Sequence, residues 1–595
     1  MADVIVGIDL GTTNSEVAIV QDGRPRVLAV DGDPILPSVV GLGDDKRLLV
    51  GHAARNQWVL APERTIRSIK RKMGEDVTVT LGDQKFRPQE ISAMILRKLK
   101  EAAERELGTP VNKAVITVPA YFNDSQRQAT REAGELAGLE VVRILNEPTA
   151  AALTYTPAPT GTERFLVYDL GGGTFDVSIL QAESGVFEVL ASHGDTHLGG
   201  DDFDELLLNH LADEFQELYT VDLRADRIAR ARLLRAAEAA KCRLSDHAFT
   251  RIEEEFIAEN DGVPLHLNTE ITREDFEDLI RPLIDRTLDC VQRALDDARL
   301  TASRIDKVVL VGGSTRTTLI GNLLEERLGQ PASREVHPDL CVALGAAVQA
   351  AIIAGQDVGA VLVDITPHSL GIKCLEIPSN YNFAVNSNKF APIVRRNTPL
   401  PATRSEVFCT VTDSQPAVDV EVFQGESEDV RRNHRVGKFL IEGLSRVPAG
   451  NQIVVQLDLT LDGILKVSAR EKATGLLKQI TIENAMARYG AEERQASQSR
   501  LDQMWGSDET EDEPTSDDDA PRLMPGPAEG QRESVQARAL LEKAERIREK
   551  VSPEDRSELD RLGEKLRVAL TDRAWGDLTA AGAELSDVLF YLEDA

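Results

Sequence analysis

The sequence predicts a multidomain protein in which an α/β domain comes first, an antiparallel β domain follows and a helical part comes last. Strand and helix patterns alternate over residues 1–355, and apolar residues then recur at every second position over 365–484. A helical period returns over 531–595. A chain of 595 residues is also too long for a single hydrophobic core, so we expect roughly two to four domains.

Within the α/β domain, apolar residues at helical spacing predict four long helices. The helix predicted over 273–300 should begin after an N-cap at Thr272, because the acids Glu274 and Asp275 fall in its first turn. The other three helices are expected over residues 89–106, 125–137 and 228–244.

In the β domain, apolar and polar residues alternate over 454–461 and again over 465–469. The Asp462-Gly463 pair between these runs predicts a hairpin. The same alternation over 418–422 predicts another strand, so this part should be a compact antiparallel sandwich.

Near the C-terminal end, Ser552 and Pro553 predict the start of a helix whose buried stripe is Leu559, Leu562 and Leu566. Amphipathic patterns before and after it, over 540–551 and 578–589, complete three helices.

The run DLGGGTFD at 169–176 joins two apolar strands through a triple-glycine turn with a carboxylate at each end. Glycines let backbone N–H groups wrap phosphate oxygens, because no Cβ blocks the approach. Aspartates cannot bind phosphate themselves, so they indicate a Mg²⁺ ion or its waters in between. A tight hairpin with solvated acids is the alternative that this run alone leaves open.

Two further turns follow the same plan. The run DLGTTNS at 9–15 follows an apolar strand over 4–8, and the run VGGSTR at 311–316 follows another that begins at Lys307. Three strand-to-glycine turns far apart in the sequence predict two half-domains that close on one nucleotide.

Two longer motifs narrow this prediction to one family. The runs ITVPAYFNDSQR at 116–127 and NEPTAA at 146–151 accompany the glycine turns. Together they resemble the 70-kilodalton heat-shock protein family, the DnaK-type molecular chaperones, in its bacterial form. The resemblance extends from Val4 to about Asn484 and resumes more weakly near the C-terminal end.

The resemblance implies an ATP-dependent chaperone that binds and releases extended hydrophobic segments of unfolded proteins. Hydrolysis of ATP to ADP and phosphate would be coupled to peptide release through an interdomain linker. The domains implied are an actin-like (ribonuclease H-like) ATPase domain over 1–355, the linker over 356–364, a β-sandwich peptide-binding domain over 365–484, a lid helix over 485–504, an acidic disordered segment over 505–530 and a helical bundle over 531–595.

The resemblance also assigns the residues of the nucleotide site. The catalytic group would be Lys70, Glu147, Asp169 and Thr174, and the Mg²⁺ and K⁺ ions would be held by Asp9, Asp169 and Asp176. ATP or ADP would contact Gly11, Thr12, Thr13, Asn14, Gly171, Gly172, Gly173, Glu238, Lys241, Ser245, Gly312, Gly313, Ser314 and Arg316. This chain departs from some relatives at Cys242, where they have an arginine against the adenine base.

For the β domain, the resemblance implies a peptide groove lined by Ile372, Leu375, Phe408, Val411, Val418 and Val420. The apolar linker run over 360–363 is expected to dock in one state and to be exposed in another. Pro119 and Arg127 match an allosteric switch, and Arg143 and Asp364 match positions used with a J-domain cochaperone. A nucleotide-exchange factor is the other partner that the resemblance implies.

Two regions depart from the family pattern. The loop over 376–396 is longer than usual and adds aromatic and asparagine residues near the groove. The acidic segment separates a shortened lid helix from the terminal bundle, which predicts a loosely closing lid and faster peptide exchange.

Composition excludes several classes of protein. The net charge of -31 disfavours nucleic acid and anionic membrane surfaces as partners, and residues 507–519 alone carry eight acids and no base. The five cysteines show no CxxC spacing, which indicates reduced thiols. With no signal peptide or membrane-spanning run, we expect a cytoplasmic protein.

Two other functions share parts of this pattern. An exchange factor or scaffold that binds ATP with little turnover would keep the same nucleotide motifs. A small-molecule kinase or an actin-like filament protein would also share them, but neither explains the linker and the β domain.

Overall fold

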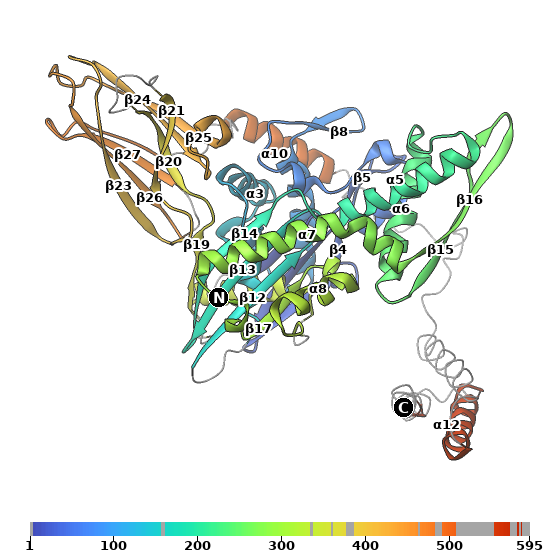
Figure 1. Ribbon diagram of the computed structural model, residues 1–595. Helices are drawn as coiled ribbons and strands as arrows, with labels where there is room; N and C mark the ends of the chain where they lie inside the picture. The colour runs from blue at the N-terminus through green and yellow to red at the C-terminus, as the bar shows by residue number, and fades with distance from the viewer. Residues whose placement is uncertain are drawn as a thin grey trace. The chain divides into compact units, whose positions relative to one another are not determined.

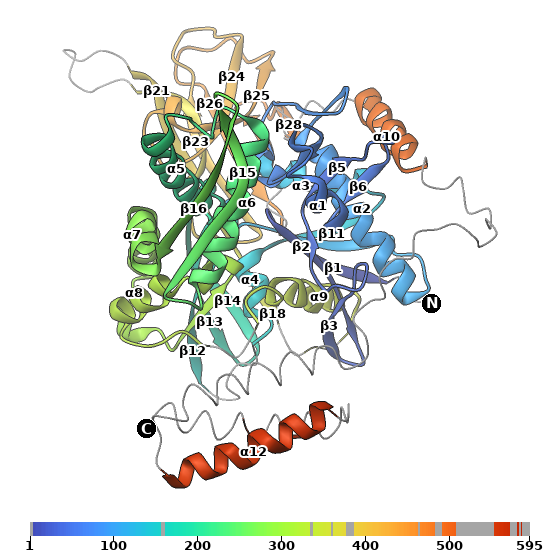
Figure 2. The ribbon, with the colours of Figure 1, turned by 90° about the vertical axis from the view of Figure 1, so that its right-hand side faces the viewer.

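The computed structural model of the protein describes residues 4–155, 161–333, 337–356, 358, 361–376, 386–461, 465–481, 491–506, 553–571, 580–581 and 585. The chain forms two compact units, Met1–Thr510 and Glu511–Ala595. Figures 1 and 2 show the ribbon from two directions. The first unit contains both the α/β domain and the β domain.

The first lobe of the α/β domain, residues 4–155, is built on a six-stranded sheet in the order β11-β10-β1-β2-β3, with β4 paired to β2. β1, β10 and β11 are parallel, whereas β1–β2 and β2–β3 are antiparallel. The strands are β1 Ile5–Leu10, β2 Asn14–Gln21, β3 Arg24–Leu28, β4 Leu36–Pro37, β10 Lys113–Val118 and β11 Glu140–Asn146.

Helices and small strands complete the first lobe. Its helices are α1 His52–Gln57, α2 Pro88–Leu107, α3 Asp124–Leu136 and α4 Glu147–Ala152, with short 3₁₀ turns η1 Pro62–Arg64 and η2 Ile69–Lys72. The small strands are β5 Val40–Leu42, β6 Leu48–Val50, β7 Thr65–Ile66, β8 Val79–Leu81 and β9 Gln84–Phe86.

The second lobe, residues 161–333, contributes four strands to a five-stranded sheet in the order β17-β12-β13-β14-β18, and the linker contributes β18. The strands are β12 Thr162–Leu170, β13 Phe175–Glu183, β14 Val186–Asp195, β17 Lys307–Val311 and β18 Val361–Val363. Its other elements are α5 Gly200–Tyr219, α6 Arg227–Leu244, β15 Phe249–Asn260, β16 Val263–Thr272, α7 Arg273–Ala298, η3 Ala302–Arg304, η4 Gly313–Arg316 and α8 Thr318–Leu328.

Helix α9, Cys341–Ile353, packs closely against both β1 and α4. A Cβ on Gly345 would lie 1.7 Å from the Ala150 carbonyl oxygen, and a Cβ on Gly7 would lie 2.1 Å from the Ala347 nitrogen. Glycine is therefore required at both contacts. Apolar residues of α4 and α9 share one core with strands of both sheets, which joins the two lobes.

The four long helices predicted from the sequence are confirmed as α2, α3, α6 and α7, each within two residues of its predicted ends. The predicted N-cap of α7 is also confirmed, because Thr272 Oγ1 accepts from the Asp275 N–H at 3.1 Å. The Asp275 carboxylate accepts in turn from the Thr272 N–H at 3.2 Å, which completes a capping box.

The β domain is a sandwich of two antiparallel four-stranded sheets, in the orders β21-β20-β24-β25 and β23-β26-β27-β28. One apolar core includes residues of both sheets. The strands are β20 Leu370–Glu376, β21 Asn386–Val394, β23 Ala402–Cys409, β24 Ala417–Gln424, β25 His434–Glu442, β26 Gln452–Leu459, β27 Leu465–Glu471 and β28 Leu477–Thr481, with a short pair β19 Ile365–Thr366 and β22 Thr398–Pro399 and a 3₁₀ turn η5 Val430–Arg432.

The predicted hairpin is confirmed by the antiparallel pairing of β26 and β27, although its turn at 462–464 lies outside the described residues. Val455, Leu457 and Leu459 point into the core as the alternation predicts. The alternation fails at Leu461, which lies beyond the end of β26 and is 46% exposed. Leu461 instead lines a small cavity that β-domain residues share with Arg127 and Asp364.

The linker residues Val361–Val363 form strand β18, which pairs in parallel with Val186–Glu188 of β14 (Figure 2). Leu362 packs against the core shared by the two lobes. The prediction that the apolar linker run docks in one state is therefore confirmed for residues 361–363 through their strand pairing, although Val361 is 59% exposed. Exposure in another state stays a prediction, and residues 357, 359 and 360 lie outside the described residues.

The predicted lid helix corresponds to α10, Ala491–Gly506, which lies beside α2 and α3 (Figure 2). Leu501 is buried in the core of the first lobe, and Arg97 Nη1 donates to Asp502 at 2.7 Å. The Trp505 indole donates to Glu101. These contacts hold α10 against the α/β domain.

The second unit contains α12, Pro553–Thr571, whose predicted stripe of Leu559, Leu562 and Leu566 is buried. The acidic segment from residue 507 and most of the predicted bundle lie outside the described residues, as does loop 377–385. Among the described helices, none combines the length and apolar character needed to span a bilayer.

Candidate nucleotide and peptide sites

The three predicted glycine turns meet at one cavity between the two lobes. The cavity has a volume of about 280 Å³. The predicted residues that line it are Asp9, Gly11, Thr12, Thr13, Asn14, Lys70, Glu147, Asp169, Gly171, Gly172, Thr174, Glu238, Lys241, Gly312, Gly313, Ser314 and Arg316. Of the predicted set, Gly173, Asp176 and Ser245 do not line it.

The turns touch one another where glycine alone fits. Gly312 has φ +85°, and a Cβ there would lie 2.4 Å from the Leu170 carbonyl oxygen. A Cβ on Gly172 would lie 1.9 Å from Thr13 Oγ1 across the cleft. Glycine therefore lets the turns at 171–174 and 311–316 pack together within the second lobe, and it lets Gly172 approach the Thr13 side chain of the first lobe.

Lys70 lies on η2 and is surrounded by carboxylates. Its Nζ donates to Glu147 Oε1 at 2.5 Å, and the Lys70 and Glu147 side chains are 4% and 10% exposed. Burial disfavours the ammonium charge, but the nearby Glu147, Asp9 and Asp169 outweigh burial and raise the pKa of Lys70. Lys70 therefore stays protonated inside the cavity.

The same burial raises the pKa of the carboxyl groups. The pKa of Glu147 is raised to about 7 by burial, against the opposing charge of Lys70. Burial also raises the pKa of Asp9, and it raises the pKa of Asp169 and Asp176 well above the ordinary value. Lys70 alone cannot balance four ionised carboxylates, so burial favours the neutral forms of these groups.

Among the described residues, three buried oxygens of the cavity wall have no hydrogen-bond partner, namely Asp169 Oδ2, Thr13 Oγ1 and Asp204 Oδ1, and the last of these forms an ion pair with Lys241 Nζ at 2.8 Å. A buried carboxylate oxygen without a donor is costly, and a hydrated cation would supply donors to it. Among the described residues, no group of three or more His, Cys, Asp or Glu side chains could enclose a metal ion directly. The donor set thus fits a cation held largely through its own waters and phosphate oxygens.

Lys241 and Glu238 lie on α6, one turn apart. Lys241 Nζ donates to Asp204 Oδ2 at 2.8 Å and to the Gly200 carbonyl at 3.2 Å. Glu238 Oε2 accepts from Arg67 Nη2 at 3.0 Å, which links the two lobes above the cavity wall. Each charge in this region therefore has its own partner.

The remaining predicted contacts belong to the same wall. Ser314 Oγ donates to the Gly171 carbonyl at 2.9 Å, and Arg316 Nη2 donates to Asp339 Oδ2 at 2.5 Å. Ser245 lies at the end of α6, where its hydroxyl donates to the Lys241 carbonyl at 3.4 Å. Cys242 lines the cavity as an exposed free thiol.

Sequence reasoning missed four acidic residues of this cavity, which are Glu16, Asp201, Asp204 and Asp339. It also missed Arg67, the partner of Glu238. A usable signal was present for two of these acids, because the run LGGDDFD at 198–204 is a fourth glycine turn followed by acids.

A chain of hydrogen bonds connects the nucleotide cavity region to the linker. Asp176 Oδ2 accepts from the Ala120 N–H at 3.0 Å, and Arg127 Nη2 donates to the Ala120 carbonyl at 2.9 Å. Arg127 Nη2 also donates to Asn146 Oδ1 at 2.6 Å, and Asn146 Nδ2 donates to Asp364 Oδ2 at 2.8 Å. Two of the predicted allosteric residues, Arg127 and Asp364, are thus joined through one asparagine.

The other two predicted allosteric residues lie close to this chain. Pro119 directly precedes Ala120, and its carbonyl accepts from the Phe122 N–H at 3.1 Å. Arg143 lies on β11, and its charge favours the ionised form of Asp364, whose pKa burial raises.

Comparison with known proteins decides the family. The model of the Hsp70 protein family matches residues 5–592. The chain belongs to the Hsp70 family. It is 49% identical over 483 residues to the chaperone protein DnaK of Thermotoga neapolitana, and the match covers 80% of this chain and 79% of that protein. The DnaK proteins of Thermotoga petrophila and Thermotoga maritima match it to the same extent.

Membership of the Hsp70 family makes this chain an ATP-dependent molecular chaperone with ATPase activity. This confirms the family, the function and the enzyme class expected from the glycine turns and the two longer motifs. The matched residues include both the α/β domain and the β domain.

In this Hsp70 chain, the β domain is docked on the α/β domain. Gln424 Oε1 accepts from the Asp124 N–H at 3.2 Å, and His368 Nε2 lies 3.0 Å from the Tyr121 carbonyl. Arg396 Nη2 donates to Asp297 Oδ1 at 2.8 Å. Together with β18, these contacts bring the motif at 116–127 against the β domain.

The six predicted groove residues fall into three classes of burial. Ile372 and Val420 are buried in the sandwich core, and Phe408 and Val418 are partly buried against it. Leu375 and Val411 are 40% and 48% exposed. The predicted set therefore extends from the core of the β domain to its surface.

Proposed function

We propose that this chain binds ATP in the cavity of about 280 Å³, hydrolyses it there and thereby controls the release of extended apolar segments from its β domain. The observation that carries the proposal is the unbroken set of contacts from Asp176 through Arg127 and Asn146 to Asp364, next to the docked linker strand β18.

The nucleotide phosphates would lie against the backbone of Gly11–Asn14 and Gly171–Thr174, whose N–H groups can donate to them. Mg²⁺ and K⁺ would fit beside Asp9, Asp169 and Asp176, because a cation would favour the ionised forms that burial disfavours. A bound Mg²⁺ ion supplies charge neutralisation for the β- and γ-phosphates.

Lys70 and Glu147 form the catalytic pair in this proposal. The Lys70 ammonium stabilises negative charge on the transferring phosphoryl group. Glu147, with a pKa of about 7, can hold or release a proton near neutral pH and orients the attacking water. Thr174 lines the cavity beside them and contributes a hydroxyl.

The adenosine part of the nucleotide would contact Glu238, Lys241, Ser314 and Arg316. The charges of Glu238, Lys241 and Arg316 are paired within the protein, so these residues would position and bind the adenosine and would not take part in the reaction. Cys242 lines this wall, and its small thiol would leave more room beside the base than the arginine expected in some relatives.

Unfolded polypeptides would bind the β domain as extended segments. Exposed Leu375 and Val411, with partly buried Phe408 and Val418, offer apolar contact next to strand backbone. Hydrolysis would release β18 and the β domain from the α/β domain, and a rebound ATP would dock them again. A J-domain cochaperone acting near Arg143 and Asp364 and a nucleotide-exchange factor would regulate this cycle, in a cytoplasmic setting.

The test is the release of a fluorescent leucine-rich peptide before and after addition of ATP with Mg²⁺ and K⁺. We expect ATP to accelerate release several-fold or more, and we expect Asn146→Ala to abolish the acceleration because it breaks the link to Asp364. Peptide binding that ignores ATP would contradict the coupling, and absence of peptide binding would favour an exchange factor.

A further inference from the structure

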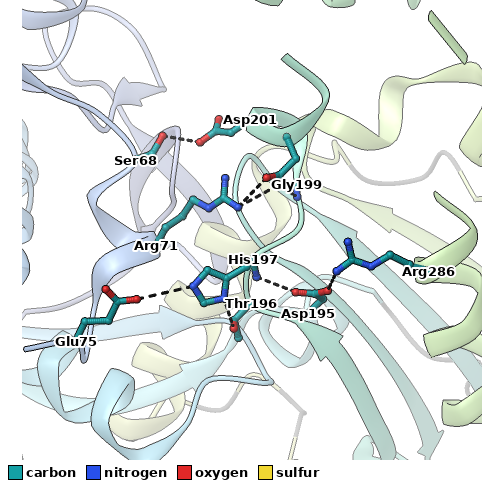
Figure 3. A network of polar contacts seen from close by, with 10 residues as sticks. Ser68, Arg71, Glu75, Asp195, Thr196, His197, Gly199, Asp201 and Arg286 are labelled. Atoms are coloured by element: carbon teal, nitrogen blue, oxygen red, sulfur yellow. Dashed lines mark hydrogen bonds and ion pairs between the residues drawn. The ribbon is translucent and has the colours of Figure 1, made fainter. Parts of the chain in front are cut away.

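Two polar contacts join the lobes, one from the residue two positions before Lys70 and one from the residue that follows it. Ser68 Oγ donates to Asp201 Oδ2 at 2.6 Å (Figure 3). Arg71 Nη2 donates to both carboxylate oxygens of Asp202, at 2.9 and 3.1 Å. We refer to the pairs Ser68–Asp201 and Arg71–Asp202 as the clasp.

The two first-lobe residues of the clasp, Ser68 and Arg71, flank Lys70 in the sequence. Lys70 lies on the short turn η2, with Ser68 just before it and Arg71 just after Lys70. Ser68 has φ +52°, a left-handed conformation that is unfavourable for a residue with a side chain. The hydrogen bond to Asp201 helps to hold this conformation, so the backbone on both sides of Lys70 is tied to the second lobe.

The second-lobe half of the clasp is continuous with the phosphate turn at 171–174. The Gly200 N–H donates to the Gly171 carbonyl at 3.0 Å, and the Asp201 N–H donates to the Gly172 carbonyl at 2.7 Å. Asp202 Oδ2 also accepts from the Gly199 N–H at 2.8 Å. The two aspartates are therefore fixed to the backbone that would hold the phosphates.

Arg71 also contacts this turn through its aliphatic stem. A Cβ on Gly173 would lie 2.8 Å from Arg71 Cγ, so the stem lies directly against the turn. Neither Arg71 nor Asp202 lines the nucleotide cavity, although Lys70 and Asp201 do. Arg71 and Asp202 can therefore act on the nucleotide only through other residues.

The Arg71–Asp202 ion pair is better shielded from water than the neighbouring Glu75–His197 pair and is therefore the stronger of the two. The Arg71 and Asp202 side chains are 22% and 29% exposed, and their contact is bidentate. A third pair across the cleft, Glu75–His197, has a separation of 3.9 Å and side chains that are 46% and 58% exposed. Such an exposed, distant pair contributes little.

We propose that Arg71 and Asp202, supported by Ser68–Asp201, are positioning residues for ATP hydrolysis, which set the Lys70 ammonium against the phosphate turn when the lobes close. This inference rests on the proposed catalytic role of Lys70. It assigns to the clasp a function in the chemical step and not in nucleotide affinity.

The test is a double-mutant cycle on the full chain with Arg71→Gln, Asp202→Asn and the double variant. Single-turnover hydrolysis of a preformed ATP complex is measured together with the Kd for ATP. We expect each single variant to lower the hydrolysis rate roughly tenfold, because a small displacement of a catalytic group is costly, and to change the Kd by less than about threefold. The double variant should be no slower than either single variant, since both remove the same contact.

Two variants make the outcome unambiguous. Arg281→Gln breaks an exposed pair with Asp285 within α7 and should leave hydrolysis unchanged. Lys70→Ala gives the reference loss of rate. Near-normal turnover of Lys70→Ala would overturn the proposed catalytic role of Lys70, on which the clasp depends. Loss in Lys70→Ala, combined with additive effects of Arg71→Gln and Asp202→Asn or with no effect of either, would overturn the clasp alone.

Discussion

Two lysines line the same cavity, yet their surroundings differ. Lys70 faces the three carboxylates of Glu147, Asp9 and Asp169. Lys241 pairs with Asp204, and its neighbour Glu238 pairs with Arg67. Carboxyl groups therefore outnumber basic groups around Lys70, whereas the acidic and basic groups around Lys241 are paired one to one. The surplus of carboxyl groups around Lys70 suits the binding of cations and the transfer of a phosphoryl group. The paired charges around Lys241 suit the binding of a ligand in a fixed position.

The largest expected effect comes from Lys70→Ala. Removal of the ammonium leaves the developing phosphoryl charge without its nearest counter-charge, so hydrolysis should fall about 100-fold or more. ATP binding should be retained, because the turns at 11–14 and 171–174 keep their backbone donors. Single-turnover hydrolysis and equilibrium titration with a fluorescent ATP analogue separate these two quantities. Near-normal turnover would show that Lys70 has no catalytic role.

Lys241→Gln should produce the opposite pattern. The change leaves the buried carboxylate of Asp204 without its cation, so the nucleotide-binding wall should lose affinity and the Kd for ATP should rise about tenfold. The single-turnover rate at saturating ATP should stay within about twofold, because no reacting group is removed. A large loss of rate with unchanged Kd would contradict the division between the two lysines.

A smaller effect concerns pH and the stability of the nucleotide-free protein. Burial raises the pKa of Glu147 from its ordinary value of 4.5 to about 7, so between these pH values the folded chain holds a proton that the unfolded chain has released. Stability should therefore fall as the pH rises from about 5 to about 7.

Glu147→Gln should reduce this slope of Tm against pH. Asp124 and Glu132, whose pKa values burial also raises to about 7, are retained in the variant and supply the remaining slope. Calorimetry at several pH values measures both proteins. Equal slopes in the wild type and the variant would show that Glu147 does not hold the proton.

The smallest expected effect comes from Cys242→Arg, on the same wall as Lys241. A guanidinium at this position can stack on the adenine base, so the Kd for ATP should fall about threefold while the hydrolysis rate stays unchanged. Cys242→Ser is the matched control, because it keeps the size of the side chain and should leave the Kd as it is. A weaker Kd in Cys242→Arg would indicate that the cavity has no room for the larger group.

The parts of the site that could be predicted from sequence are those determined locally. The turns at 9–15, 169–176 and 311–316 each combine a buried strand with glycines, and both signals lie within one short segment. The helices α2, α3, α6 and α7 carry their own apolar period and caps, so their ends were also predictable.

The partners of these residues could not be predicted, because they come from distant positions. Arg67 and Glu238 are 171 residues apart, and Arg71 and Asp202 are 131 residues apart. The burial of Leu461 could not be predicted either, because it depends on where the strand ends. Its alternation with polar neighbours predicts a core position, but the strand ends first and the side chain lies at the contact between domains instead.

The pairing of β18 with β14 also determines what becomes exposed when the domains separate. While β18 is docked, it covers the backbone N–H and C=O groups of Val186–Glu188 at the end of the five-stranded sheet. Whenever β18 leaves, those groups become an open sheet edge, and open edges are templates for the addition of foreign strands. A chaperone that protects other proteins from aggregation would then carry, during part of its own cycle, an aggregation-prone edge of its own.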